Sequence, residues 1–292
     1  MKNFHGTGVA LVTPFNADGS VDYQGLERLI NHLVNGGIDY LVSLGTTGET
    51  ATLSKEEKKK VWNFTAEINN GRLPLVAGIG GNNTQEIANE IKEFQNNSYS
   101  AVLSVSPYYN KPTQEGIYQH YKFLSELSAM PIMVYNVPGR TGSNITPETT
   151  CRLAHDFKNI IATKEASGSF EQFNQIMRDK PEDFLLISGD DPIALPMIAA
   201  GAVGVISVIG NALPKHLSEM INLCLEGKFA QALPLHLSLL EITRLAFIEG
   251  NPAGIKSALK QLNICDDVVR LPLVKASNNL NALIADQLKQ LM

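Results

Sequence analysis

The sequence has few cysteines and no long cluster of basic residues. Its three cysteines, Cys151, Cys224 and Cys265, are far apart and include no Cys-x-x-Cys pair. We therefore expect neither a disulfide framework nor a zinc-binding cysteine cluster, and a reducing cytoplasmic location fits best. The 24 basic and 29 acidic residues give a formal net charge of -5, without a long Lys/Arg run. This balance argues against a nucleic-acid-binding protein.

Long hydrophobic segments are also scarce. The first 20 residues contain only a short apolar run, so no export signal is expected. Residues 192–214 carry no charge over a length that could in principle cross a bilayer. Pro196 and three glycines interrupt this segment, however, and its second half is β-branched. We expect a buried helix followed by a buried strand, and no membrane association.

What the chain does contain is a regular series of short apolar runs. Hydrophobic residues make up 44% of its 292 residues, enough for a large core. Eight runs without polar alternation occupy residues 8–12, 40–44, 73–79, 101–105, 131–135, 159–164, 184–188 and 204–209. Stretches with helical periodicity, such as 23–34 and 84–94, separate them. This alternation predicts an α/β protein with a closed (β/α)₈ barrel, and an open doubly wound sheet is the alternative.

The pattern changes near residue 225. From there the sequence predicts about three helices, with breaks at 250–252 and 271–272. We therefore expect a catalytic barrel over residues 1–224 and a C-terminal helical extension over residues 225–292. No internal repeat or low-complexity linker divides the chain further.

In a barrel of this kind, the residues just after each strand form the site. The second run is followed by GTTGE at 45–49, whose two hydroxyls and backbone N–H groups can bind a small anion, although an ordinary tight turn is as good an explanation. Two adjacent tyrosines in the loop 106–112 could relay protons or simply pack. Tyr135 ends the fifth run, and Arg140 follows it at a position where it could grip a carboxylate. Taken singly, a core tyrosine and a solvated arginine are the plainer interpretation.

Lys164 is the most informative of these residues because it closes the sixth apolar run. A lysine at the mouth of a barrel is partly desolvated, which favours its nucleophilic neutral amine and attack on a carbonyl. The alternatives are an ammonium that reaches out to solvent or pairs with Glu165. A lysine, a phenol, a hydroxyl-rich loop and an arginine at one barrel mouth favour an enzyme that condenses carbonyl compounds. No histidine pair has metal-ligand spacing and no dinucleotide motif is complete, so neither a metal nor a redox cofactor is expected.

Five motifs between residues 45 and 191 resemble those of one family, and the resemblance spans essentially the whole chain. GTTGE at 45–49, SPYYNKPTQEG at 106–116, YNVPGRTG at 135–142, IIATKEASG at 160–168 and ISGDD at 187–191 resemble the 4-hydroxy-tetrahydrodipicolinate (dihydrodipicolinate) synthases, a family of pyruvate-dependent class I aldolases. The resemblance implies a homotetrameric barrel, a dimer of dimers. It also implies a lyase that condenses pyruvate with L-aspartate 4-semialdehyde, the first committed step of lysine (diaminopimelate) biosynthesis.

The resemblance also assigns the reacting groups. Lys164 would carry a covalent pyruvate imine, so that no other cofactor is needed, and Tyr135 would donate and accept protons. Thr46 and Tyr109 would complete a proton relay with Tyr135, with Tyr109 reaching into the site of a neighbouring subunit. A phenol is a weak base unless neighbouring hydroxyls share the charge, which agrees with such a relay.

Substrate contacts follow from the same motifs. Thr47 and the backbone of Ile206 would hold pyruvate, whereas Arg140 and Gly189 would face the semialdehyde. N-acetylneuraminate lyases and sugar-acid aldolases share this chemistry and form the main alternative. Arg140 argues against them, because they resemble one another in lacking an arginine there. A catalytically inactive barrel that serves as a scaffold is a third possibility, disfavoured because all the expected groups are present.

One part of the family pattern differs. In family members inhibited by lysine, the inhibitor binds residues that match Ala51, Asn82, Glu86 and Tyr108, together with two histidines. Lys55 and Lys58 stand at those histidine positions. Each exposed cation should disfavour a cationic ligand by a few tenths to about 1 kcal/mol. We therefore expect weak or absent inhibition by L-lysine at this possible allosteric site.

Overall fold

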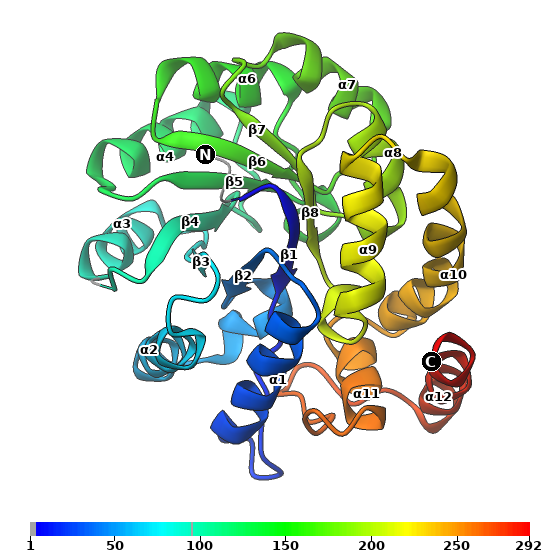
Figure 1. Cartoon of the computed structure of the whole chain (residues 1–292). Coiled ribbons are helices and arrows are strands. Elements are labelled where there is room, and N and C mark those ends of the chain that lie inside the picture. The colour runs from blue at the N-terminus through cyan, green and yellow to red at the C-terminus, as the bar shows by residue number, and fades with distance from the viewer. Residues whose placement is uncertain (1–3, 95) are drawn as a thin grey trace.

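The eight predicted strands form a closed barrel. The computed structural model describes residues 4–94 and 96–292, with strands in the order β1 to β8 and every neighbouring pair parallel. Strand β1 pairs with β8 as well as with β2, so the sheet has no free edge. Helices surround the barrel (Figure 1). The (β/α)₈ prediction is confirmed, and the open sheet that we considered as an alternative is wrong.

The elements lie close to the predicted runs. The strands are β1 (Gly6–Ala10), β2 (Tyr40–Ser43), β3 (Leu75–Gly78), β4 (Tyr99–Val105), β5 (Ile132–Asn136), β6 (Ile160–Glu165), β7 (Leu185–Ser188) and β8 (Gly204–Ser207). The helices are α1 (Tyr23–Asn35), α2 (Lys55–Asn69), α3 (Thr84–Glu93), α4 (Gln114–Leu127), α5 (Pro138–Thr141), α6 (Pro147–Asp156), α7 (Phe170–Asp179), α8 (Ala194–Ala199), α9 (Pro214–Leu225), α10 (Phe229–Ile248), α11 (Ala253–Gln261) and α12 (Asn278–Leu291).

The strands are apolar throughout because both of their faces are buried. Alternate side chains point into the barrel, where Tyr40, Val42 and Ile187 belong to an interior cluster. The intervening residues pack against the helices. Gly8 leaves room for the ring of Tyr40, since a Cβ at residue 8 would lie 2.3 Å from that ring. The interior is therefore filled with side chains, and the space for chemistry is confined to one end.

Capping residues set the limits of the predicted helices. Asp22 accepts a hydrogen bond from the backbone N–H of Gly25 at the start of α1, and the apolar face of that helix is buried. Helix α3 begins at Thr84 after its N-cap Asn83, and ends before Phe94, whose backbone is extended. The periodicity at 23–34 and 84–94 thus predicted both helices to within one residue.

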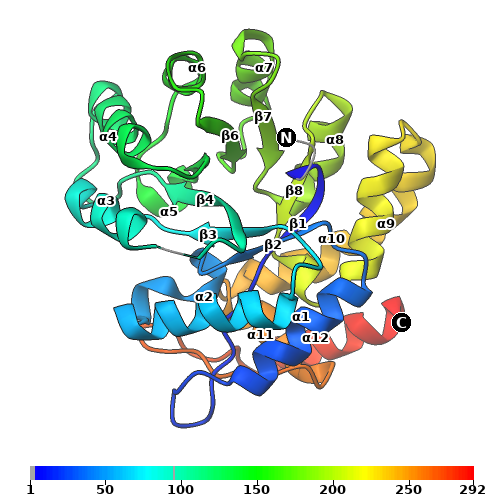
Figure 2. The same ribbon diagram turned by 60° about the vertical axis from the view of Figure 1, so that its left-hand side comes forward.

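The C-terminal part contains the three expected helices, α10, α11 and α12. Helix α12 is shorter than the periodic segment from Leu271 onward suggested. It begins at Asn278 because the Ser277 hydroxyl accepts the N–H of Leu280 as an N-cap. Pro272 lies in the irregular segment before it. The three helices gather on the side of the barrel that also carries α1 and α9 (Figures 1 and 2).

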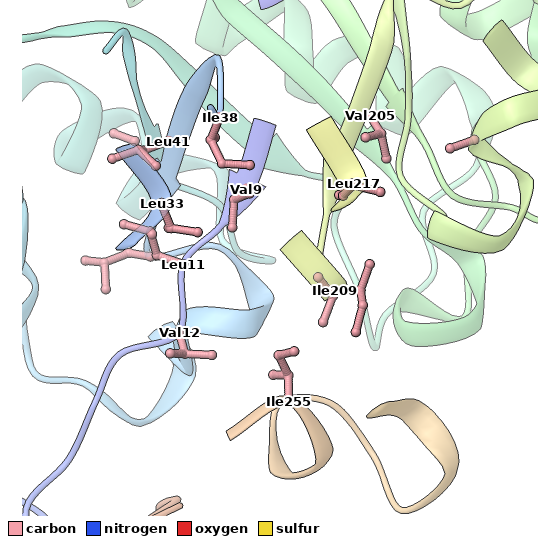
Figure 3. Close-up of a cluster of buried hydrophobic side chains, with 14 of the residues drawn as sticks. Val9, Leu11, Val12, Leu33, Ile38, Leu41, Val205, Ile209, Leu217 and Ile255 are labelled. Atoms are coloured by element: carbon pink, nitrogen blue, oxygen red, sulfur yellow. The ribbon is translucent and has the colours of Figure 1, made fainter. Parts of the chain in front are cut away.

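This extension shares the main hydrophobic core. Ile255 of α11 is fully buried and belongs to the same cluster as Val12 and Ile209, beyond the ends of β1 and β8 (Figure 3). The uncharged segment 192–214 forms α8 followed by β8, as expected. Within the described residues, no helix combines the length and hydropathy needed to span a membrane.

Candidate active site

Tyr135 and Lys164 lie side by side on the interior face of the barrel. The register of the parallel strands β5 and β6 pairs Tyr135 with Lys164. The Lys164 ammonium nitrogen lies 4.2 Å from the centre of the Tyr135 ring. Both side chains are buried, with exposures of 5% for Lys164 and 7% for Tyr135. The strand register alone therefore brings the predicted nucleophile and the predicted proton carrier together.

Glu165 does not neutralise Lys164, because successive strand residues point to opposite faces. Its carboxylate accepts hydrogen bonds from the side chains of Asn136 and Gln172, each at 3.0 Å, and from the backbone N–H of Ser167 at 2.7 Å. The alternative in which Lys164 pairs with Glu165 is wrong. Glu165 instead links the ends of β5 and β6 to the helices outside the barrel.

A cavity of about 660 Å³ opens at the carboxyl ends of the strands. Its lining includes six of the eight residues expected to act on substrate: Thr46, Thr47, Tyr135, Arg140, Lys164 and Gly189. Ile206 lies on β8 with its side chain in the barrel interior, and the prediction concerned its backbone. The cavity is large enough for two small substrates.

Tyr109 does not line this cavity either. Its side chain is 89% exposed and does not line the pocket of its own chain. Its φ is +73° and that of Lys111 is +45°, so this loop contains two non-glycine residues in the left-handed region. Such backbone is costly and needs support from its surroundings. Its role in the site of a second copy stays a prediction.

The hydroxyl loop after β2 is compact and well anchored. Residues 46–48 and 50–52 form two short 3₁₀ turns with Glu49 between them, and Thr47 is only 3% exposed. The Thr13 hydroxyl donates to the carbonyl of Gly48 over 2.7 Å. The Asn251 side-chain amide donates to the Thr47 hydroxyl oxygen over 2.9 Å. Thr46 and Thr47 are thus presented at the cavity by a fixed backbone.

Two carboxylates lie beyond β7, in the motif ISGDD. Asp190 lines the cavity, and Asp191 accepts the backbone N–H groups of Val208 and Ile209 at 2.9 and 3.2 Å. Burial raises the pKa of both carboxyls, and the charge of Lys164 opposes that shift. Asp191 thereby fixes the chain just after β8, two residues beyond Ile206.

One wall of the cavity comes from α10, which follows α9 and so is not among the residues just after a strand. Thr243, Arg244 and Phe247 line the cavity together with Asn251 just after this helix. The Arg244 guanidinium makes two hydrogen bonds to Glu241, at 2.9 and 2.8 Å. The only sequence signal was a pair of charged residues, Glu241 and Arg244, within a largely apolar helical segment.

The possible allosteric residues lie on the surface, outside this cavity. Asn82 donates a 3.4 Å hydrogen bond to the Tyr108 carbonyl, and Ala51, Lys55 and Glu86 are exposed. Lys58 lies 3.5 Å from Glu90, so part of its charge is already balanced. Lys55 therefore contributes more than Lys58 to the expected repulsion of a cationic ligand.

Metal binding was not expected, and this stays a prediction. Among the residues that the structure describes, no three His, Cys, Asp or Glu side chains are grouped as metal ligands.

Comparison with known proteins identifies the family. The sequence model of the dihydrodipicolinate synthetase family matches residues 3–291. A 4-hydroxy-tetrahydrodipicolinate synthase from Flavobacterium psychrophilum is 55% identical over 281 residues, 96% of each chain. The dihydrodipicolinate synthase structure from Aquifex aeolicus is 40% identical, with a TM-score of 0.95 over 99% of this chain and 98% of its own.

The structure of a third relative contains a bound ligand. The chloride-inhibited dihydrodipicolinate synthase from Acinetobacter baumannii, solved in complex with pyruvate, is 37% identical with a TM-score of 0.95 over 98% of both chains. These matches extend over nearly the whole length of the chain and include all five motifs. The chain belongs to the dihydrodipicolinate synthetase family.

Proposed function

We propose that the protein is a Schiff-base-forming lyase that condenses pyruvate with L-aspartate 4-semialdehyde to 4-hydroxy-tetrahydrodipicolinate, in lysine biosynthesis. The observation that carries the proposal is the pairing of Lys164 with Tyr135 on adjacent strands, at the base of a cavity that also contains Arg140. The names of the relatives support the product, and the pyruvate complex of one relative supports the first substrate.

The chemistry follows from these groups. The Lys164 amine attacks the pyruvate ketone, and loss of water leaves an imine. The imine withdraws electrons, so the methyl group loses a proton and becomes an enamine. The enamine carbon then forms a bond to the aldehyde carbon of the second substrate. The amino group of that substrate displaces Lys164 and closes the ring, which restores the free enzyme.

Each step moves a proton, and Tyr135 is the nearest acid and base. Thr46 lines the same cavity and passes protons between Tyr135 and solvent. Tyr109 would complete this relay from a second copy of the chain, since its own ring faces outward. This arrangement requires a dimer at least, and we propose a homotetramer in the cytoplasm.

Different residues bind the two substrates. Thr47 and the backbone near Ile206 hold the carboxylate of pyruvate, while Arg140 and Gly189 receive the semialdehyde. Arg140 is exposed at the edge of the cavity, where its guanidinium can bind a carboxylate with two hydrogen bonds. N-acetylneuraminate and other sugar acids carry hydroxyls in the corresponding part of the substrate, so Arg140 favours the semialdehyde.

The test is to trap the imine and to measure turnover. Borohydride reduction with pyruvate should add one reduced adduct to Lys164, located by peptide mass spectrometry. A coupled reductase should report condensation with the semialdehyde. Lys164→Ala should lose both, whereas Lys158→Ala, a matched change in the exposed turn before the same strand, should keep both. Cleavage of N-acetylneuraminate without condensation would contradict the proposal.

A further inference from the structure

The segment after α10 reaches back to the hydroxyl loop from far along the chain. The Asn251 amide donates to the Thr47 hydroxyl oxygen over 2.9 Å, and the Lys256 ammonium donates to the Glu49 carboxylate over 2.5 Å. The backbone N–H of Arg270 donates to the other oxygen of Glu49 over 2.9 Å. These partners lie 204 to 221 residues apart in sequence. The C-terminal extension therefore makes hydrogen bonds to two residues of the hydroxyl loop, Thr47 and Glu49.

Glu49 is the residue on which the shape of this loop depends. It ends the first 3₁₀ turn and begins the second with φ +52° and ψ +34°, the left-handed region that is unfavourable for a residue with a side chain. Its side chain is almost completely buried, and so is that of Lys256. A buried carboxylate needs a charged or hydrogen-bonding partner. The Lys256 ammonium supplies the charge and also donates to the Val268 carbonyl at 2.7 Å.

Asn251 determines which way the Thr47 hydroxyl can donate. Because the amide N–H of Asn251 occupies a lone pair of the Thr47 oxygen, the hydroxyl proton must point elsewhere. Within residues 4–94 and 96–292, no protein atom accepts it. Thr47 lines the cavity, so a substrate carboxylate is the acceptor that suits this geometry. A charge-assisted bond of this kind is stronger than one between neutral groups.

We propose that Asn251 and Lys256 are positioning residues for pyruvate, which keep the 46–49 loop in the shape that directs the Thr47 hydroxyl to the pyruvate carboxylate. The inference rests on the proposed function and deepens it. Lys256 acts through Glu49 and Asn251 acts through Thr47, so neither needs to touch the substrate. The C-terminal extension then serves substrate recognition as well as core packing.

The test measures how much pyruvate gives half-maximal imine trapping. In Asn251→Ala this concentration should rise about five- to tenfold, the effect of losing one hydrogen bond, with kcat at saturating pyruvate nearly unchanged. Asn281→Ala is the matched control. Asn281 is in the same extension and accepts a bond from the Ser257 hydroxyl, but it does not line the cavity. It should leave the half-saturating concentration at the wild-type value.

A double-mutant cycle separates positioning from direct contact. Thr47→Val should raise the half-saturating pyruvate concentration, and adding Asn251→Ala to it should change little more, because both changes remove the same interaction. The proposal would be overturned if the two substitutions raised the half-saturating pyruvate concentration independently, so that their effects multiplied. It would also be overturned if Asn251→Ala had the wild-type half-saturating concentration while the wild-type protein formed the adduct. Wild-type protein that forms no adduct would instead refute the proposed function and this inference with it.

The ion pair is tested by removing both charges together. Glu49→Gln with Lys256→Met avoids an unpaired buried charge, which is what makes single changes at such sites destabilising. This double variant should also need more pyruvate for half-maximal trapping, and an unchanged value in a folded variant would remove Lys256 from the proposal. If circular dichroism shows that it is unfolded at the assay temperature, the same double variant is measured at a lower temperature where it is folded, with the same two outcomes.

Discussion

Replacing Gly189 by alanine should displace the side chain of Lys164. A Cβ at residue 189 would lie 2.8 Å from the Cβ of Ala166 and 3.0 Å from both Cγ and Cε of Lys164. Carbon atoms pack at about 3.5–4.0 Å, so the lysine side chain must move by roughly 0.5–1 Å. A displacement of about 1 Å at a reacting group can cost about 100-fold in rate. We expect the rate of imine formation to fall by about 10- to 100-fold.

The same clash should cost little stability by comparison. Overpacking typically costs about 1–3 kcal/mol, which for a chain of this size lowers Tm by only several degrees. The assay is the time course of borohydride trapping at saturating pyruvate, with thermal unfolding measured in parallel. Gly81→Ala is the control, because its Cβ would meet only Ile87 at an ordinary 3.6 Å. Imine formation at the wild-type rate in a folded Gly189→Ala variant would refute the geometric argument.

Three further predictions concern proton transfer, acid stability and regulation. Tyr135→Phe should lower turnover by about 10²- to 10⁴-fold in the coupled assay, the usual contribution of a general acid and base, and wild-type turnover would exclude Tyr135 from that role. Hydrogen bonds from Arg270 lower the pKa of Glu57 from 4.5 to about 2, so its stabilisation is present above about pH 4.5 and is lost as pH falls toward 2. After allowance for solvent screening, urea unfolding should show Glu57→Gln losing about 1–2 kcal/mol at pH 6 and almost nothing near pH 2; an equal loss at both pH values would contradict this. Submillimolar L-lysine should not inhibit turnover of the wild-type protein, and the Lys55→Ala variant should be inhibited more strongly by L-lysine. Strong inhibition of the wild-type protein would show that the cation at residue 55 does not protect the enzyme.

The barrel could be predicted because its strands are buried on both faces. Each apolar run marks one strand, and the strand ends then place Thr46, Tyr135, Lys164 and Gly189 at one mouth. Only local information is needed for this step, since consecutive parallel strands are neighbours in a barrel. The start of α12 was predicted less well, because its apolar spacing continues upstream of Ser277 into a segment that does not form a helix.

Contacts between distant parts of the chain could not be predicted in the same way. Thr243 and Phe247 lie on α10, and nothing in the spacing of that helix indicates that it borders the cavity. Tyr109 was placed by family resemblance alone, and in the single chain its ring faces solvent. The partners of Glu165 depend on which face of β6 it occupies. That face follows from the strand register, which the sequence did not provide.

Lys164 and Lys256, the buried lysines among the described residues, show why burial by itself does not identify a nucleophile. Lys256 is fully buried in α11, where desolvation lowers its pKa and the charge of Glu49 opposes that shift. Its ammonium donates to Glu49 and to the Val268 carbonyl, so its electron pair is unavailable for attack on a carbonyl carbon. Lys164 is almost as buried, but its nitrogen faces the Tyr135 ring and the cavity, and no carboxylate in the described part of the chain lies within ion-pair distance. Lys256 thus stabilises the hydroxyl loop, whereas Lys164 is free to react. The difference between the two lysines is the buried Glu49 carboxylate, which pairs with Lys256.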